Sequence, residues 1–279
     1  MTQTIAQMGT AMGPHVVEAC RALFDAEQQV LAARVPVLAA DCVYGPDPRH
    51  RLDLYRTGDG SGLPVVLFIH GGGFRMGDKG DGGSWANAAV ARAMAEAGFL
   101  GAAMNYRLLP QARWPEGGED VCAAVEWLRA HAAEFDGDPA RIVVVGTSAG
   151  AVHIATALQL QGDLPVRGAV LLSGLYGYTP LDERDEVYYG PNADYPARMP
   201  RDAVVETTVP LFVAGAQFDP ARFQQEFAGL LNERVQRHGV LPRAHYASGH
   251  NHYSMAMHIG TADRRLTDEI VDFVRDCVG

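Results

Sequence analysis

Arg141-Ile-Val-Val-Val-Gly146-Thr-Ser148-Ala-Gly150 joins a continuous apolar run to the pentapeptide G-x-S-x-G. A short apolar run is typical of a buried strand, and residues 149–160 after it favour a helix. A turn that sharp leaves no room for flanking side chains, which explains glycine at positions 146 and 150. The pattern therefore predicts a nucleophilic Ser148 held above a sheet, beside the backbone N–H groups that begin the helix.

Strands and helices alternate on both sides of this stretch. Apolar runs predict further buried strands at 65–69, 99–104, 169–172 and 210–214, and residues 51–55 alternate like an exposed edge strand. Helices are expected at 14–34, 84–97, 119–134, 223–237 and 263–274. Such alternation predicts one α/β domain over 1–279, with a mostly parallel sheet flanked by helices. Residues 176–206, rich in proline, tyrosine and charge, are expected to form a small cap.

Composition narrows the class of protein. The 279 residues are 48% hydrophobic and carry a formal charge of −10, with no basic stripe, so neither a nucleic acid nor an anionic membrane is an expected partner. Four scattered cysteines are expected to be free thiols in a reducing compartment. No secretory signal or membrane span is apparent, so we expect a cytoplasmic protein.

A second glycine-rich segment follows the strand at 65–69. His70-Gly71-Gly72-Gly73-Phe74 lets the backbone approach a ligand closely, and we expect the Gly72, Gly73 and Ala149 amides to bind a developing oxyanion. The segment lacks the spacing of a phosphate-binding loop, and no cofactor is expected. His70 is expected to brace the loop by hydrogen bonding.

A serine nucleophile needs a base, and the base needs an orienting carboxylate. Asp219 is the only acid at a predicted strand end between Ser148 and the last histidines. It could instead cap the helix that starts near Arg222. We choose His252 as the base and keep His250 as the alternative. The two could also share a strand face as metal ligands, but no third ligand is evident, and no metal site is expected.

With these residues assembled, the chain resembles the carboxylesterase and arylformamidase branch of the α/β-hydrolases, close to the hormone-sensitive-lipase-like esterases. The resemblance covers residues 44–275. It rests on the segments 44–55, 70–74 with 77–79, 105–110 with 114–115 and 119–120, 146–150, 219–220 and 249–253.

The resemblance implies an α/β-hydrolase fold, a Ser148–Asp219–His252 triad and an oxyanion hole formed by Gly72, Gly73 and Ala149. In this family an aromatic residue commonly follows the catalytic histidine, which favours His252. Two features depart from the pattern: Thr147 stands where many relatives have aspartate, and the short cap suggests an accessible pocket for a modest acyl group.

The expected substrate is therefore a small carboxylic ester, cleaved through an acyl-enzyme. An arylformamidase acting on the formyl amide of an aromatic amine is the main alternative, since the cap tyrosines could line an aromatic pocket. A non-catalytic ligand receptor on the same fold is a third. The helix at 14–34 could pack over the pocket or against the second subunit of a homodimer.

Overall fold

The computed structural model describes residues 2–80, 85–162 and 164–279. Within them a single mixed sheet has the strand order β1-β2-β4-β3-β5-β6-β7-β8. β1–β2 and β2–β4 pair antiparallel, and every other neighbouring pair is parallel. The strands are β1 (Val37–Val43), β2 (Arg51–Tyr55), β3 (Leu63–Ile69), β4 (Leu100–Met104), β5 (Gly137–Thr147), β6 (Gly168–Leu172), β7 (Leu211–Phe218) and β8 (Arg243–Asn251).

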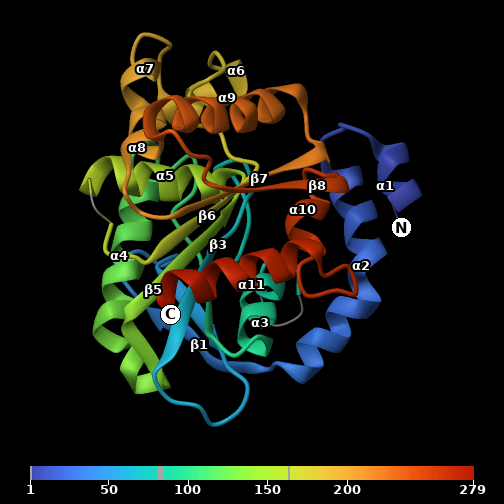
Figure 1. Ribbon diagram of the computed structural model, residues 1–279, viewed down its shortest axis with the longest axis vertical. Helices are drawn as coiled ribbons and strands as arrows, with labels where there is room; N and C mark the ends of the chain where they lie inside the picture. Colours follow the sequence, from blue (N-terminus) through green and yellow to red (C-terminus); the bar gives the residue numbers. More distant parts are fainter. Residues whose placement is uncertain (1, 81–84, 163) are drawn as a thin grey trace.

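Helices cover both faces of this sheet (Figure 1). One hydrophobic core lies between the sheet and α4, α5, α8 and α9, and a second lies between the opposite face and α2, α3, α10 and α11. The helices are α1 (Thr2–Met8), α2 (Pro14–Arg34), α3 (Ala88–Glu96), α4 (Glu116–His131) with a 3₁₀ turn (Ala132–Phe135), α5 (Ala149–Gln161), α6 (Glu183–Tyr189), α7 (Tyr195–Arg198), α8 (Arg201–Glu206), α9 (Ala221–His238), α10 (Ser254–Met257) and α11 (Arg265–Val278).

Burial on both faces explains why the central strands are continuous apolar runs. In β3, every side chain from Val65 to Ile69 is buried, because alternate residues enter opposite cores. The predicted parallel sheet flanked by helices is confirmed, and α2 has the predicted bounds. The start of the helix expected at 84–97 falls partly outside the described residues; its described part begins at Ala88.

The prediction that residues 51–55 form an exposed edge strand is wrong. β2 lies between β1 and β4, and Leu52 to Tyr55 are all buried. The alternation of polar and apolar residues in β2 suggested a solvent-exposed face, but Asp53 is buried in an ion pair. The Lys79 ammonium lies 2.8 Å from its carboxylate. The edge strand on this side of the sheet is β1, which the sequence analysis did not predict.

The segment expected to form a cap runs between β6 and β7 and contains α6, α7 and α8. Figure 1 shows α6 and α7 beside α9 at one end of the molecule. The carboxyl ends of the parallel strands β3 to β8 face this end, which is where an open α/β sheet binds its ligands. The N-terminal helices α1 and α2 lie at the side of the molecule, near β8 and α10.

Candidate active site

Ser148 occupies the turn between β5 and α5 in a backbone conformation that residues other than glycine rarely adopt. Its φ is 53° and its ψ is −119°. A Cβ on Gly146 would lie 2.6 Å from the Gly150 backbone, and one on Gly150 would lie 2.1 Å from the Ile69 carbonyl oxygen. Both glycines are therefore required by close packing of the turn, as the sequence predicted. Ser148 itself remains partly exposed.

Three side chains from separate elements form one hydrogen-bond chain. His252, directly after β8, places Nε2 3.0 Å from Ser148 Oγ and Nδ1 2.7 Å from Asp219 Oδ1. The Phe223 ring, from α9, lies against the imidazole with a centroid distance of 4.3 Å. This packing holds the imidazole between the hydroxyl and the carboxylate.

Asp219 is fully buried after β7, and its second oxygen is also occupied. Asp219 Oδ2 accepts hydrogen bonds from Ser173 Oγ at 2.6 Å and from the Ala216 amide at 2.8 Å. The alternative that Asp219 caps α9 is wrong: the N-cap residue is Pro220, and among the described residues no side chain makes a capping hydrogen bond to the first turn of the helix. Sequence reasoning missed Ser173, although a serine directly after the buried strand β6 was a usable signal.

The glycine loop lies against the serine turn. A Cβ on Gly71 would lie 3.2 Å from Ser148 Cβ, whereas a Cβ on Gly73 would meet nothing within 4 Å. Among the described residues, the amides of Gly72, Gly73 and Ala149 donate no hydrogen bond. Three free N–H groups near one hydroxyl can bind a negatively charged oxygen.

His70 faces away from the serine and braces the loop. Its Nδ1 lies 2.6 Å from the Gly71 carbonyl oxygen, and Tyr106 stacks on the ring and donates to the His70 carbonyl oxygen at 2.9 Å. Burial lowers the pKa of His70 to about 4, so the ring is neutral near pH 7. A neutral, buried ring fits the expected bracing role.

His250 is directed elsewhere. Its Nε2 lies 3.2 Å from Asp263 Oδ2 and its Nδ1 lies 3.1 Å from Ser254 Oγ. In the described residues it makes no contact with Ser148 or Asp219. The end of the strand separates the two histidines: His250 still belongs to β8, whereas His252 follows it and so can turn toward Ser148.

The cap covers the site with aromatic side chains. Tyr188 stacks on Phe74 of the glycine loop, with centroids 3.9 Å apart and an interplanar angle of 4°. Tyr189 and Tyr195 belong to the same buried cluster, which also contains Ala149. Tyr188, Tyr189 and Tyr195 are therefore buried packing residues in the cluster that contains Ala149, and not scattered surface residues.

A buried glutamate, also missed in the sequence analysis, holds the start of the cap. Glu226 of α9 is fully buried and accepts hydrogen bonds from the amides of Tyr176, Gly177 and Thr179 and from Thr179 Oγ1. The signal was absent because a single glutamate on an amphipathic helix has the pattern of a solvated residue.

Comparison with known proteins agrees with this arrangement. The BD-FAE family model matches residues 52–170, which contain the glycine loop and the serine turn. The structure aligns with an esterase from Pyrobaculum calidifontis over 100% of this chain and 98% of that one, with a TM-score of 0.64 and 25% identity. The chain therefore has the α/β-hydrolase fold.

The curated relatives match over 40% to 77% of this chain. Carboxylesterase NlhH from Mycobacterium tuberculosis is 36% identical over 156 residues, covering 55% of this chain and 46% of that protein. A probable isoprenylcysteine alpha-carbonyl methylesterase, ICMEL1, from Oryza sativa subsp. japonica is 45% identical over 114 residues, covering 40% of this chain and 25% of that protein. The chain thus spans less than half the length of these relatives.

Two further expectations concern cysteines and membranes. The four cysteines are free thiols, as predicted. Among the helices that the structure describes, none has both the length and the apolar character needed to cross a bilayer.

Proposed function

We propose that this α/β-hydrolase cleaves small carboxylic esters through an acyl-enzyme formed on Ser148. The observation that carries the proposal is the continuous hydrogen-bond chain from Ser148 Oγ through His252 to the buried Asp219 carboxylate. The esterase names of the relatives support the same reaction.

In the proposed mechanism, Ser148 Oγ attacks the ester carbonyl while His252 Nε2 takes its proton. Asp219 stabilises the resulting imidazolium through Nδ1, and Ser173 and the Ala216 amide keep the carboxylate oriented. The amides of Gly72, Gly73 and Ala149 bind the oxyanion; loss of one such donor typically costs about 3 kcal/mol of transition-state stabilisation. His252 then protonates the leaving alcohol, and water attacks the acyl-enzyme.

The first test is Ser148→Ala. The variant is expected to lose turnover of p-nitrophenyl acetate by a factor of at least about 10⁴, because the nucleophile is gone and only oxyanion binding remains. Alanine keeps the strained positive φ at position 148, whereas glycine adopts it without strain. Ser148→Gly therefore serves as the control for backbone effects on folding. Turnover retained by either variant would reject Ser148 as the nucleophile.

A second candidate is hydrolysis of a formyl amide of an aromatic amine, and it is favoured by the aromatic character of the cluster that contains Phe74, Tyr188 and Ala149. A panel of p-nitrophenyl esters of increasing chain length, with N-formylkynurenine included, separates the candidates by kcat/KM. Higher kcat/KM on the formyl amide than on every ester would replace our proposal with the second candidate.

A ligand receptor that does not catalyse is distinguished by covalent labelling. A fluorophosphonate probe reacts with an activated serine and not with an ordinary hydroxyl. We expect stoichiometric labelling of the wild-type protein and none of Ser148→Ala. An unlabelled wild-type protein that still binds ligands would support the receptor.

A further inference from the structure

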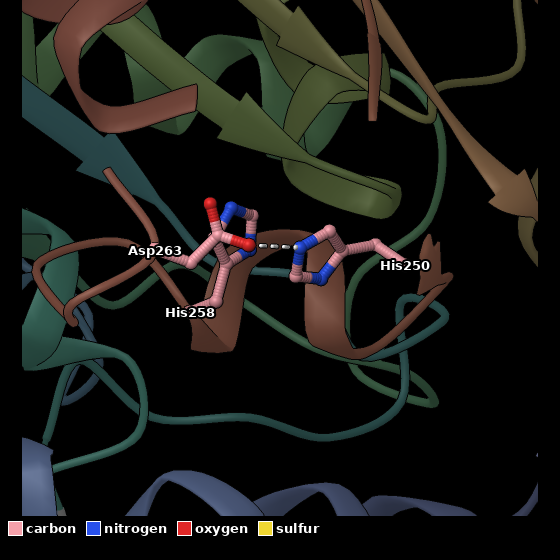
Figure 2. A group of neighbouring side chains, drawn as sticks. All are labelled: His250, His258 and Asp263. Atoms are coloured by element: carbon pink, nitrogen blue, oxygen red, sulfur yellow. Dashed lines mark hydrogen bonds and ion pairs between the residues drawn. The ribbon is translucent and has the colours of Figure 1, made fainter. Parts of the chain in front are cut away.

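The segment after β8 carries a second group of polar side chains, separate from the Ser148 site. His250 at the end of β8, His258 after α10 and Asp263 before α11 are brought together by the turns of this segment. One ring nitrogen of each histidine and one carboxylate oxygen of Asp263 all lie within 4.8 Å of one another. Figure 2 shows the carboxylate lying beside both rings.

One residue sets the orientation of both rings through their Nδ1 atoms. His258 Nδ1 donates to the Ser254 carbonyl oxygen at 2.7 Å, and His250 Nδ1 lies 3.1 Å from Ser254 Oγ. The rings stack, with centroids 3.7 Å apart and an interplanar angle of 21°, so one ring must turn out of the stack before both Nε2 lone pairs can point at one ion. A backbone carbonyl on one imidazole nitrogen is the usual way in which a protein orients a metal-binding histidine through the other nitrogen.

The ring nitrogens opposite these Nδ1 atoms are the ones that can face a cation. Because His258 Nδ1 donates to the Ser254 carbonyl oxygen, a neutral His258 ring carries its lone pair on Nε2, and within the described ranges that nitrogen has no hydrogen-bond partner. His250 Nε2 lies 3.2 Å from Asp263 Oδ2, so it faces the third candidate ligand.

We propose that His250, His258 and Asp263 bind Zn²⁺, each with one atom, and leave a fourth position to water. Two imidazoles and one carboxylate are a common zinc ligand set. Zn²⁺ bonds these atoms at about 2.0–2.2 Å, so the ligand atoms of a tetrahedral site lie about 3.4 Å apart. Atoms that now lie up to 4.8 Å apart therefore need to close by up to about 1.4 Å. A neutral His250 ring that carries its proton on Nε2 changes tautomer when the ion binds: the proton moves to Nδ1, where Ser254 Oγ accepts it, and Nε2 is left with the lone pair.

Arg265 is the main competitor for the carboxylate. Its Nε lies 2.8 Å from Asp263 Oδ1 and its Nη2 lies 2.5 Å from Oδ2. A guanidinium so close opposes a second cation by Coulomb repulsion and occupies the oxygen that faces His250. This competition makes the proposal testable in both directions, because removing a ligand and removing the competitor have opposite effects.

The test is Zn²⁺ titration of the full chain after treatment with a chelator, followed by calorimetry. The wild-type protein is expected to bind one equivalent at micromolar Zn²⁺. His258→Gln is expected to lose at least about tenfold in affinity, as loss of a ligand does, and Arg265→Gln to gain several-fold. His131→Gln, which alters an exposed histidine–glutamate pair, is the matched control and should change nothing.

Co²⁺ in place of Zn²⁺ identifies the ligands by absorption. A tetrahedral site of nitrogen and oxygen gives visible bands without the near-ultraviolet charge-transfer band of a thiolate; that second band would place the ion on a cysteine and overturn the proposal. Absence of saturable binding at sub-millimolar Zn²⁺, or equal affinity in His258→Gln, would also overturn it. If His258→Gln does not fold, unchanged affinity in Arg265→Gln decides against the site. The readouts are independent of ester hydrolysis.

Discussion

At the level of single residues, the site combines strained backbone at two serines with one fully buried carboxylate. Ser148 and Ser173, each directly after a parallel strand, both have positive φ, at 53° and 48°. Such conformations cost about 1–2 kcal/mol for residues other than glycine and persist where the surrounding structure enforces them. At these two positions the strain directs one hydroxyl toward His252 and the other toward Asp219.

Ser173 is predicted to be a positioning residue for Asp219. Ser173→Ala removes one donor from a buried carboxylate, which should lower stability by about 1–3 kcal/mol. We expect kcat on p-nitrophenyl acetate to fall about tenfold with KM nearly unchanged, because orientation of His252 affects only the reacting geometry. Steady-state kinetics and urea unfolding measure the two effects.

Ser173→Gly is the matched control for this prediction. Glycine relieves the positive φ and should recover about 1 kcal/mol of the stability lost in Ser173→Ala, but it supplies no hydroxyl and should not recover kcat. Wild-type kcat in both variants would mean that the Ala216 amide alone orients Asp219.

At the scale of elements, the site depends on two attachments between segments distant in the sequence. Glu226 of α9 holds the start of the cap, and Gln28 of α2 holds the segment after His252. Both side chains are buried, and both satisfy backbone groups of irregular segments that have no secondary-structure partner of their own.

Glu226→Gln is expected to destabilise the cap. An amide can present only one acceptor oxygen, so some of the four donors now bound by the carboxylate lose their partner, at about 1.5–3 kcal/mol each. Urea unfolding should show a loss of about 3 kcal/mol, and limited proteolysis should cleave first within 176–206. Glu126→Gln on α4 is the control: its carboxylate is an exposed partner of Arg129, and its loss should cost less than about 1 kcal/mol.

Gln28→Met tests the second attachment. Gln28 Nε2 donates to the carbonyl oxygens of Met257 and Ile259, both at 2.9 Å, and methionine fills the same space without a donor. Two buried carbonyls without partners should cost about 2 kcal/mol in urea unfolding. The exposed neighbour variant Gln29→Met should stay within about 0.5 kcal/mol of wild type. An equal effect of both variants would show that the hydrogen bonds contribute nothing specific.

The whole molecule has buried histidines on both sides of its sheet, which couples its stability to pH. Burial lowers the pKa of His70 to about 4 and those of His153 and His258 to about 3, against about 6.5 in an unfolded chain. Between the folded and unfolded pKa values, the unfolded chain therefore binds protons that the folded chain does not bind. This contribution to stability is complete above about pH 6.5 and is lost as the pH falls toward the folded-state values.

We expect the free energy of unfolding to fall between pH 7 and pH 5, with a slope that approaches about 4 kcal/mol per pH unit when all three unfolded histidines are protonated. Unfolded carboxylates titrate below this range, so they contribute little to it. Urea unfolding at several pH values measures the slope. His153→Gln should reduce the limiting slope by about a third; an unchanged slope would mean that His153 is protonated in the folded state.

Much of this fold was predictable because its decisive signals are local. Five apolar runs indicated the strands β3 to β7, and the tight turn at Ser148 and the glycines of the loop were recognisable because steric clash acts between near neighbours in the chain. Ser148 was predicted from its glycine-flanked motif, Asp219 from its place at a strand end, and His252 from the family resemblance. His252 lies within hydrogen-bonding distance of both other residues.

Tertiary structure alone decided features that depend on a partner remote in the sequence. β2 became an internal strand because Lys79 neutralises Asp53, and Ser173 and Glu226 acquired their contacts only when β6, β7 and α9 packed together. His250 was separated from Ser148, and joined to His258 and Asp263, by the turns after β8. A buried polar side chain needs a hydrogen-bond or ionic partner. The packing of distant segments, and not sequence spacing, decides which group that partner is.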